Sequence, residues 1–216
     1  MSARERMLAR IRERQGKPQR PEPSELEAVR AHLATHPVSP GPRDEWDPLV
    51  RFRERALSLA STLDEAASWS EVPARVAAYL RERELPTRAV CWRELLELDW
   101  AASGIEVEAR SAVGDDMVGI TGGFCAIAET GTLVTLSGEQ TPATVSLLPE
   151  THIAIVRASR VVRSMEDAWA LMRREHESLP RAVSFISGPS RTADIEQTVT
   201  LGAHGPYRVH IVVVAH

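Results

Sequence analysis

The sequence predicts an α/β fold, layered α/β/α, in which a mostly parallel sheet is covered by helices on both faces. Short runs rich in β-branched residues alternate with helical patterns from residue 87 onward. Several of these runs, including HIAIV and IVVV, are almost wholly apolar, which is typical of strands buried on both faces of a parallel sheet. The length of 216 residues fits one such domain with an appendage. An antiparallel strand at one edge remains compatible with this pattern.

Residues 1–45 are expected to form a helical arm rather than a domain. The arm begins with an arginine-rich helix whose apolar face is formed by Met7, Leu8 and Ile11. After a linker rich in proline, the run SELEAVRAHLATH predicts a second helix with Ser24 as its N-cap. The stretch 36–48 contains too many prolines for a helix or a central strand. An arm of this kind is suited to packing on a partner subunit.

Residues 46–216 are expected to form the α/β domain, which begins with two helices at 49–67 and 73–84. The runs RELLELDWAA and SMEDAWALMRREHESL predict further helices between the strands. Ligands of such sheets bind in the loops beyond the carboxyl ends of the strands, so we expect a site there. The expected strands are 87–92, 105–110, 117–121, 132–137, 152–159, 182–187 and 208–216.

The composition excludes several classes of function. The net charge of -4 and the isoelectric point near 6.0 argue against a nucleic-acid partner, because binding phosphates needs concentrated basic charge. Cys91 and Cys125 form no CxxC pair, so we expect no iron–sulfur cluster, structural metal or other cofactor. Both lie in apolar runs, as expected of reduced thiols in a cytoplasmic protein. No stretch approaches the roughly 20 apolar residues of a membrane span.

The segment 119–140, GITGGFCAIAETGTLVTLSGEQ, is the first of two that carry candidate functional residues. Gly122 and Gly123 follow an expected strand, and a glycine pair there lets backbone N–H groups face a ligand. ETGT could equally be a simple turn in which the glutamate caps a neighbouring amide. In the functional interpretation, Glu129 supplies a carboxylate at the mouth of the sheet, and Thr130 and Thr132 supply hydroxyl groups. Gly131 lies between the two threonines and belongs to the same candidate site.

The second segment, residues 187–214, reads SGPSRTADIEQTVTLGAHGPYRVHIVVV. A strand is expected to end at Ser187, and Thr192 is expected to cap a helix. The N–H groups at that helix start, together with the guanidinium of Arg191, would bind a carboxylate or phosphate. Alternatively, the acidic residues only complement the helix dipole and Arg191 pairs with one of them. The candidate binding residues are Gly188, Ser190, Arg191, Thr192, Asp194 and Glu196.

His204 lies in a turn beside this second segment, where an imidazole could donate or accept a proton. A purely structural role is the alternative. His152 and His210 lie within expected strands and are interpreted as hydrogen-bonded residues rather than as ligands. We expect the loops at 129–132 and 188–194, which are far apart in the sequence, to meet over the same edge of the sheet.

Together, ISGPSRTADIEQTVTLGAHGPYRVHIVVV and the preceding GITGGFCAIAETGTLV closely resemble the lactate-utilisation protein C family, also called the LUD domain. The two motifs stand in the family's order and at about its separation. The resemblance extends from about Thr87 to the C-terminus, and the long GPSRTADIE run followed by GAHGP is specific. The motif positions that match are Glu129, Thr130, Gly131, Gly188, Pro189, Ser190, Arg191, Thr192, Asp194, Glu196, His204 and Gly205.

This resemblance implies a fold similar to the sugar-phosphate isomerase and CoA-transferase-like α/β sheets. It also implies a role in a system that oxidises L-lactate to pyruvate, in which separate iron–sulfur subunits carry the redox centres. The chain would then bind a small organic-acid anion or support those partner subunits. The rival interpretation is a stand-alone isomerase or CoA-transferase-like enzyme, with Glu129 as nucleophile or base near His204. A third is a non-catalytic module whose N-terminal arm docks on a partner.

Overall fold

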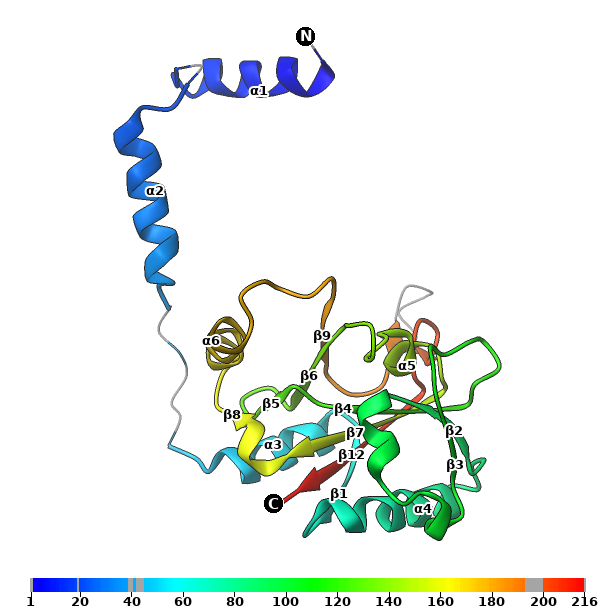
Figure 1. Cartoon of the computed structure of the whole chain (residues 1–216). Coiled ribbons are helices and arrows are strands. Elements are labelled where there is room, and N and C mark those ends of the chain that lie inside the picture. The colour runs from blue at the N-terminus through cyan, green and yellow to red at the C-terminus, as the bar shows by residue number, and fades with distance from the viewer. Residues whose placement is uncertain (1, 19, 39–40, 42–44, 193–199, 216) are drawn as a thin grey trace. The chain divides into compact units, whose positions relative to one another are not determined.

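The structure is a computed structural model that describes residues 2–18, 20–38, 41, 45–192 and 200–215 (Figure 1). Its contacts divide the chain into two compact units, Met1–Arg43 and Asp44–His216. In the described part of the chain, no helix is both long enough and apolar enough to cross a membrane.

The first unit contains the helices α1 (Ala3–Arg14) and α2 (Pro23–Thr35). Ser2 and Glu5 form a capping box at the start of α1. The N-cap of α2 is Glu22 rather than the expected Ser24, because Pro23 has a fixed φ that suits the first position of a helix. Neither helix contains a buried residue.

The second unit begins with α3 (Pro48–Ser58), which is followed by strand β1 (Thr62–Ala66). The predicted helix over 49–67 is therefore wrong in its second half. Ala60 adopts a left-handed conformation, with a φ of 66°, and turns the chain. Pairing of β1 with a distant strand overrides the helical pattern of the sequence, since tertiary context outweighs local propensity.

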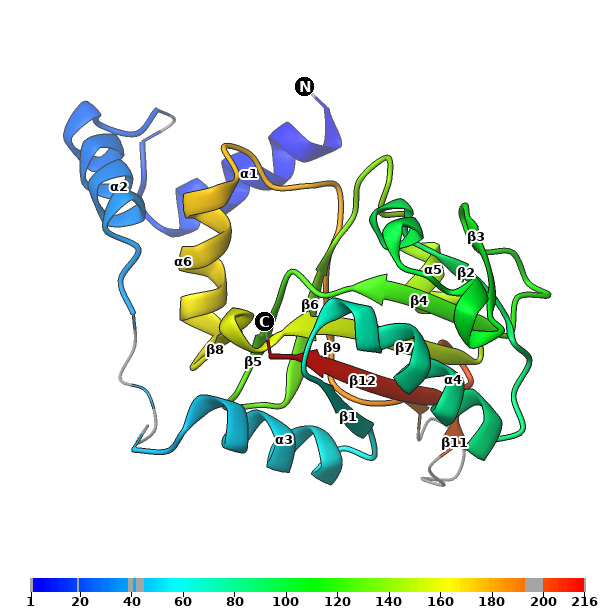
Figure 2. The same ribbon diagram turned by 60° about the horizontal axis from the view of Figure 1, so that its bottom comes forward.

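Six strands form one parallel sheet in the order β1-β12-β7-β4-β2-β3 (Figures 1 and 2). Every neighbouring pair in this sheet is parallel, so the carboxyl ends of all the strands share one edge. The expected α/β fold with a mostly parallel sheet is confirmed. Besides β1, the strands are β2 (Arg88–Cys91), β3 (Glu106–Ala109), β4 (Val118–Gly122), β7 (Thr151–Arg157) and β12 (Arg208–Val214).

A second sheet contains β5 (Cys125–Ile127), β6 (Thr132–Leu136), β8 (Val161–Val162) and β9 (Val183–Ile186). Its order is β8-β5-β6-β9; β6 pairs antiparallel with both neighbours, and β5 pairs parallel with β8. The expected strands at 132–137 and 182–187 thus belong to a separate mixed sheet rather than to an edge of the parallel one.

Alternate residues of the parallel strands pack against different layers, as the two-residue repeat of a strand requires. Helix α4 (Val72–Glu82) packs on the face that carries Ile153 and Val212. Helix α3 and the second sheet pack on the face that carries Ala154 and Ile211. The far side of the second sheet is covered by α6 (Met165–Glu175).

The predicted helix RELLELDWAA is instead two short 3-10 turns, η2 (Arg93–Glu97) and η3 (Ala101–Ser103). Leu98 between them is extended, with a ψ of 144°, so the helical ladder cannot continue. The indole N–H of Trp100 donates to the carbonyl oxygen of Leu95 at 2.7 Å and holds this arrangement. The remaining short elements are η1 (Trp69–Glu71), α5 (Thr144–Leu147) and η4 (Ala158–Arg160).

Two fully buried histidines lie in central strands of the parallel sheet. His152 Nε2 is 2.8 Å from the hydroxyl oxygen of Thr121, and His210 Nδ1 is 2.9 Å from that of Thr62. The His210 ring also stacks on Tyr79, with ring centres 3.9 Å apart. Burial lowers the pKa of each histidine to about 4, so both are neutral at neutral pH.

Lowering the pH from 7 to 5 is expected to destabilise the α/β unit. The two histidines bind protons in the unfolded chain near pH 6.5 but resist protonation in the fold until about pH 4. Their contribution is therefore complete above pH 6.5 and is lost as the pH falls toward 4. The expected loss at pH 5 is about 2 kcal/mol for each histidine, measured by urea unfolding at the two pH values.

Replacing either histidine with glutamine should reduce this pH dependence, whatever its effect on stability at pH 7. His32→Gln on the exposed surface of α2 is the matched control and should leave the pH dependence unchanged. An equal free energy of unfolding at pH 7 and pH 5 would contradict the conclusion that burial keeps both histidines neutral in the folded protein.

Candidate functional site

The sheet order creates a topological switch point between β2 and β4. The chain continues from β2 to β3 on one side, whereas β7, the strand of this sheet that follows β4 in sequence, lies on the other side. In open α/β sheets, the crevice outside the carboxyl ends of two such strands is the usual place for a ligand.

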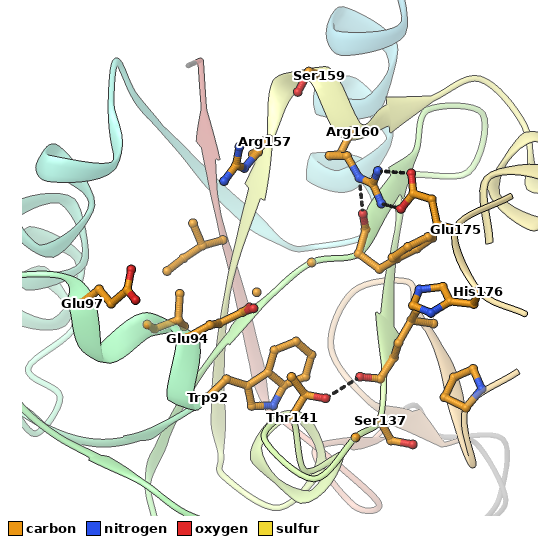
Figure 3. Close-up of a pocket in the computed structure, with 18 of the residues that line it drawn as sticks. Trp92, Glu94, Glu97, Ser137, Thr141, Arg157, Ser159, Arg160, Glu175 and His176 are labelled. Atoms are coloured by element: carbon orange, nitrogen blue, oxygen red, sulfur yellow. Dashed lines mark hydrogen bonds and ion pairs between the residues drawn. The ribbon is translucent and has the colours of Figure 1, made fainter. Parts of the chain in front are cut away.

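A cleft of about 1150 Å³ opens at this point (Figure 3). Trp92 and Glu94 line it directly after β2, and Gly122 and Gly123 line it at the end of β4. Arg157, the last residue of β7, stands on the adjacent strand. The opposite wall comes from the second sheet, η4 and the chain after α6.

Arg157 is the cation that the fold leaves available in this cleft. Its side chain is exposed, and its guanidinium lies over the Trp69 ring, 5.1 Å from the ring centre. Among the residues that the structure describes, no hydrogen bond or ion pair occupies this guanidinium. A planar guanidinium that stacks on an aromatic ring keeps its N–H donors in one plane, which suits a carboxylate.

Glu94 contributes a carboxylate on the other side of β4. Its Oε1 atom lies where a side chain at position 122 would begin, so Gly122 is required for this close approach. Burial by the surrounding protein raises the pKa of Glu94, and the positive charge of Arg157 opposes that rise. Solvent nevertheless reaches the Glu94 side chain, which is exposed.

Arg160 also lines the cleft, but its charge is already paired. Its terminal nitrogens bind both carboxylate oxygens of Glu175 at 2.7 and 2.9 Å, and its Nε donates to the carbonyl oxygen of Phe124 at 2.8 Å. This pairing lowers the pKa of Glu175. The pair fixes the end of α6 beside Phe124, whose ring also contacts His176 with ring centres 5.6 Å apart. Arg160 thus shapes the wall of the cleft (Figure 3).

The N–H of Gly123 is not free to face a ligand, contrary to the expectation from the sequence. The N–H of Gly123 donates to the carbonyl oxygen of Ile155, and the N–H of Phe124 donates to that of Val134, each at 2.8 Å. These bonds join β4 to β7 and to the second sheet.

The ETGT segment lies at the opposite end of β6 from the cleft. Leu136 and Ser137, at one end of β6, line the cleft. Thr132 begins the strand four residues before Leu136, which corresponds to a distance of roughly 13 Å along β6. The backbone N–H of Glu129 donates to the carbonyl oxygen of Arg163 at 3.0 Å. Gly131 is left-handed, with a φ of +67°, and packs on the backbone of α3 at Arg55 and Ala56.

The structure does bring the two candidate segments together at this place. The hydroxyl oxygens of Thr132 and Ser187 are 2.7 Å apart, and those of Thr130 and Thr132 are also 2.7 Å apart. Gly188 packs against Leu59 at the end of α3. The guanidinium of Arg191 donates to the carbonyl oxygen of Leu59 at 2.8 Å, so part of its donor capacity serves the fold.

Arg191–Thr192 forms the short strand β10, which pairs antiparallel with β11 (Thr200–Leu201). Thr192 is the last described residue before the expected helix, so its role as an N-cap stays a prediction. Asp194 and Glu196, and the proposed helix itself, lie outside the described residues.

His204 and Ser190 lie at the other edge of the parallel sheet. Ser190 bonds through its backbone with Gly202 and Pro206, in the turn that precedes β12. His204 is exposed and lines a separate hollow of about 740 Å³ with Glu150 and Leu147. Since β7 and β12 run from this edge to the cleft over seven residues each, the two places are roughly 20 Å apart.

The motif-based prediction did not include the cleft residues Glu94 and Arg157. Their positions in the sequence could have indicated them. Arg157 directly follows the apolar run HIAIV, and Glu94 lies two residues after TRAVCW. Both positions lie at the carboxyl ends of expected strands, where a ligand site was expected. Only the strand order shows that the switch point and the cleft lie beside these two residues rather than beside the ETGT and GPSR segments.

The parallel sheet and the cleft at its switch point define the class of this unit as an α/β domain with a cleft at the carboxyl edge of the sheet. Within this class, a family model described as the LUD domain matches residues 75–214. The chain belongs to the LUD domain family.

Several relatives of known name are similar to the chain over part of their length. The lactate utilization protein C of Geobacillus sp. (strain WCH70) is 42% identical over 100 residues, which cover 45% of this chain and 42% of that protein. The lactate utilization protein C of Bacillus subtilis (strain 168) is 35% identical over 135 residues, which cover 57% and 56%. The chain thus spans about half the length of the curated relatives it matches.

A crystal structure of a DUF162 family protein from Deinococcus radiodurans is similar in fold, with a TM-score of 0.58 and 23% sequence identity. The similarity covers 81% of this chain and 99% of that protein.

Gly131→Ala is expected to destabilise the protein more than Gly104→Ala does. Both glycines are left-handed, but a Cβ at Gly131 would lie 2.5 Å from the backbone nitrogen of Ala56, whereas nothing lies within 4 Å of one at Gly104. The control substitution should cost about 1 kcal/mol through its φ alone. Gly131→Ala should cost at least about 2 kcal/mol more, because α3 must shift. Urea unfolding measures both; equal losses would show that α3 does not constrain the ETGT turn.

Proposed function

We propose that this chain is a component of a lactate-utilisation system and binds a small organic-acid anion in the cleft, with Arg157 holding its carboxylate. The names of the relatives support the first part of this proposal. The observation that carries the second part is the unoccupied guanidinium of Arg157 at the carboxyl edge of the parallel sheet.

The arrangement around Arg157 favours an anion for an electrostatic reason. Its guanidinium would form charge-assisted hydrogen bonds with a carboxylate, which are stronger than those between neutral groups. Arg160 offers no equivalent charge because Glu175 neutralises it. An incoming carboxylate therefore finds its strongest partner at Arg157.

The cleft is larger than a three-carbon acid needs. Its volume of about 1150 Å³ lies beyond the range of roughly 300–1,000 Å³ that is usual for drug-sized ligands, whereas lactate has only a few heavy atoms. We propose that the remaining space admits the electron acceptor of an iron–sulfur partner subunit in the cytoplasm. Oxidation of L-lactate to pyruvate releases two electrons and two protons, and that partner would take the electrons.

The N-terminal arm is proposed to contact such a partner. Leu26, Val29 and Leu33 lie on one face of α2 at helical spacing and are 42%, 56% and 62% exposed. Burying this stripe on another subunit would remove apolar surface from water. If the proposal holds, a chain without residues 1–45 should fold but fail to co-purify with the partner.

A stand-alone isomerase or CoA-transferase-like enzyme that uses Glu129 is the second candidate. It is favoured by the chain of hydroxyl groups from Thr130 through Thr132 to Ser187, next to Arg191. The motif residues would then act at that end of the second sheet. Turnover of acyl-CoA donors or sugar phosphates by the purified protein, lost in Glu129→Gln, would establish this function.

The substitution Arg157→Ala is expected to weaken L-lactate binding, whereas Arg191→Ala should leave it unchanged. Losing a charge-assisted hydrogen-bond pair costs about 1.5–3 kcal/mol, which is roughly a tenfold to hundredfold rise in Kd. Both arginines are exposed, but Arg191→Ala also removes the hydrogen bond to Leu59, so urea unfolding of both variants is the control for folding. Isothermal titration calorimetry, or quenching of the fluorescence of Trp69 and Trp92 in the cleft, measures the affinity.

The reverse result, in which only Arg191→Ala loses binding, would move the anion site to the ETGT and GPSR segments. An intact protein that binds no L-lactate would contradict the proposed anion-binding role.

A further inference from the structure

We infer that the amino-terminal edge of the parallel sheet is an interface through which two copies of this chain form a symmetric dimer. The cleft lies at the opposite, carboxyl edge, because β7 and β12 run from one edge to the other over seven residues each. The inference therefore does not depend on the ligand proposed for the cleft.

Exposed apolar side chains gather at this edge. Of the ten large hydrophobic residues that are exposed in the described part of Asp44–His216, six lie in the segments that lead into β4, β7 and β12. Single exposed apolar side chains are ordinary on a protein surface, whereas a group of them marks an interaction site. This apolar patch consists of Val113, Met117, Leu147, Leu148, Leu201 and Tyr207.

The members of the apolar patch lie next to one another. Four of the six line the hollow of about 740 Å³ that precedes β7 and β12. The N–H of Thr151 donates to the carbonyl oxygen of Met117 at 3.0 Å, which joins the chain before β4 to the start of β7. The N–H of Ala112 donates to the hydroxyl oxygen of Thr144 at 3.1 Å and so brings Val113 beside α5.

The core holds the α5 part of the apolar patch in place. Helix α5 packs so closely on β4 that Gly119 has no room for a Cβ beside the carbonyl oxygen of Val145. Val145 and Ser146 are buried by this contact, while Leu147 and Leu148 stay exposed. The two leucines are therefore presented to solvent by a fixed support, which lowers the entropic cost of burying them on another molecule.

Tyr207 is fixed in a similar way. Backbone hydrogen bonds of Ser190 with Gly202 and Pro206, each 2.9 Å long, hold the turn that precedes Tyr207. The Arg208 guanidinium lies over the Tyr207 ring, 4.9 Å from its centre. Tyrosine and arginine are the residue types that most often dominate the energy of protein interfaces.

The charges beside the apolar patch favour a second copy as the partner. Arg208 Nη1 lies 3.8 Å from Glu150 Oε2, too far for a hydrogen bond, and both side chains are partly exposed. In a two-fold interface, Glu150 of each copy can pair with Arg208 of the other copy. A face that carries both charges side by side is thus complementary to itself. A uniformly acidic or basic partner would instead oppose one of them with a like charge.

Leu57 provides a matched control for a substitution in the apolar patch. Leu148 is 52% exposed and Leu57, which lies in α3 outside the patch, is 50% exposed. Leu148→Glu would place two carboxylates inside the interface, because a substitution occurs twice in a symmetric dimer. Leu57→Glu adds the same charge elsewhere. Urea unfolding of both variants checks that they remain folded.

Analytical ultracentrifugation measures the dimer Kd of the intact chain and of both variants. The intact chain and Leu57→Glu should sediment as dimers at micromolar concentration, whereas Leu148→Glu should raise the dimer Kd by at least about a hundredfold. If the surface binds a different protein, the intact chain alone will sediment as a monomer, which would overturn the inference. A dimer that Leu148→Glu leaves unchanged would also overturn it.

Mixtures of two further variants test the pairing of Glu150 with Arg208. Glu150→Arg brings like charges together across the interface, and so does Arg208→Glu, so each should raise the dimer Kd at least about tenfold. Mixed in equal amounts, the two variants should form a heterodimer, because each contact across the interface then joins opposite charges. Native mass spectrometry distinguishes this species by its mass. A mixture that forms no heterodimer would overturn the pairing.

Discussion

Parallel pairing of β4 with its two neighbours is the constraint on which the candidate site depends. The ladder aligns the carboxyl ends of β2, β4 and β7, and the change of direction between β2 and β4 leaves a crevice there instead of a covering helix. Glu94, Gly122 and Arg157 become neighbours only through this alignment. Gly122 and Arg157 end strands whose buried residues belong to the core, and Glu94 lies in the 3-10 turn after β2.

The second sheet separates the cleft from the ETGT turn, which the sequence suggested as part of the site. Strand β6 joins the ETGT turn at one end to the wall of the cleft at the other. The turn packs on α3 through Gly131, and the neighbouring loop packs on the same helix through Gly188 and Arg191. These motif residues therefore hold the second sheet and α3 together in this structure, whatever ligand they also bind. His204 lies at the opposite edge of the parallel sheet, too far away to share a small ligand with Arg157.

Much of the architecture could be predicted from local patterns. Runs such as HIAIV and IVVV indicated buried parallel strands because no polar residue interrupts them, and the motif segments identified the family. Strand β1 was missed because TLDEA continues the helical pattern of α3, and only pairing with β12 makes it extended. The cleft was missed for a similar reason. Arg157 lies over Trp69, and its charge acts on Glu94. Both residues are distant from Arg157 in the sequence, so no motif spacing could have linked the three.

The central claim is that a small organic-acid anion binds at the carboxyl edge of the parallel sheet. A crystal structure of the protein soaked with L-lactate tests it most directly. The account predicts electron density for the carboxylate against the Arg157 guanidinium. Density beside Arg191 or His204, with the cleft filled only by water, would contradict it.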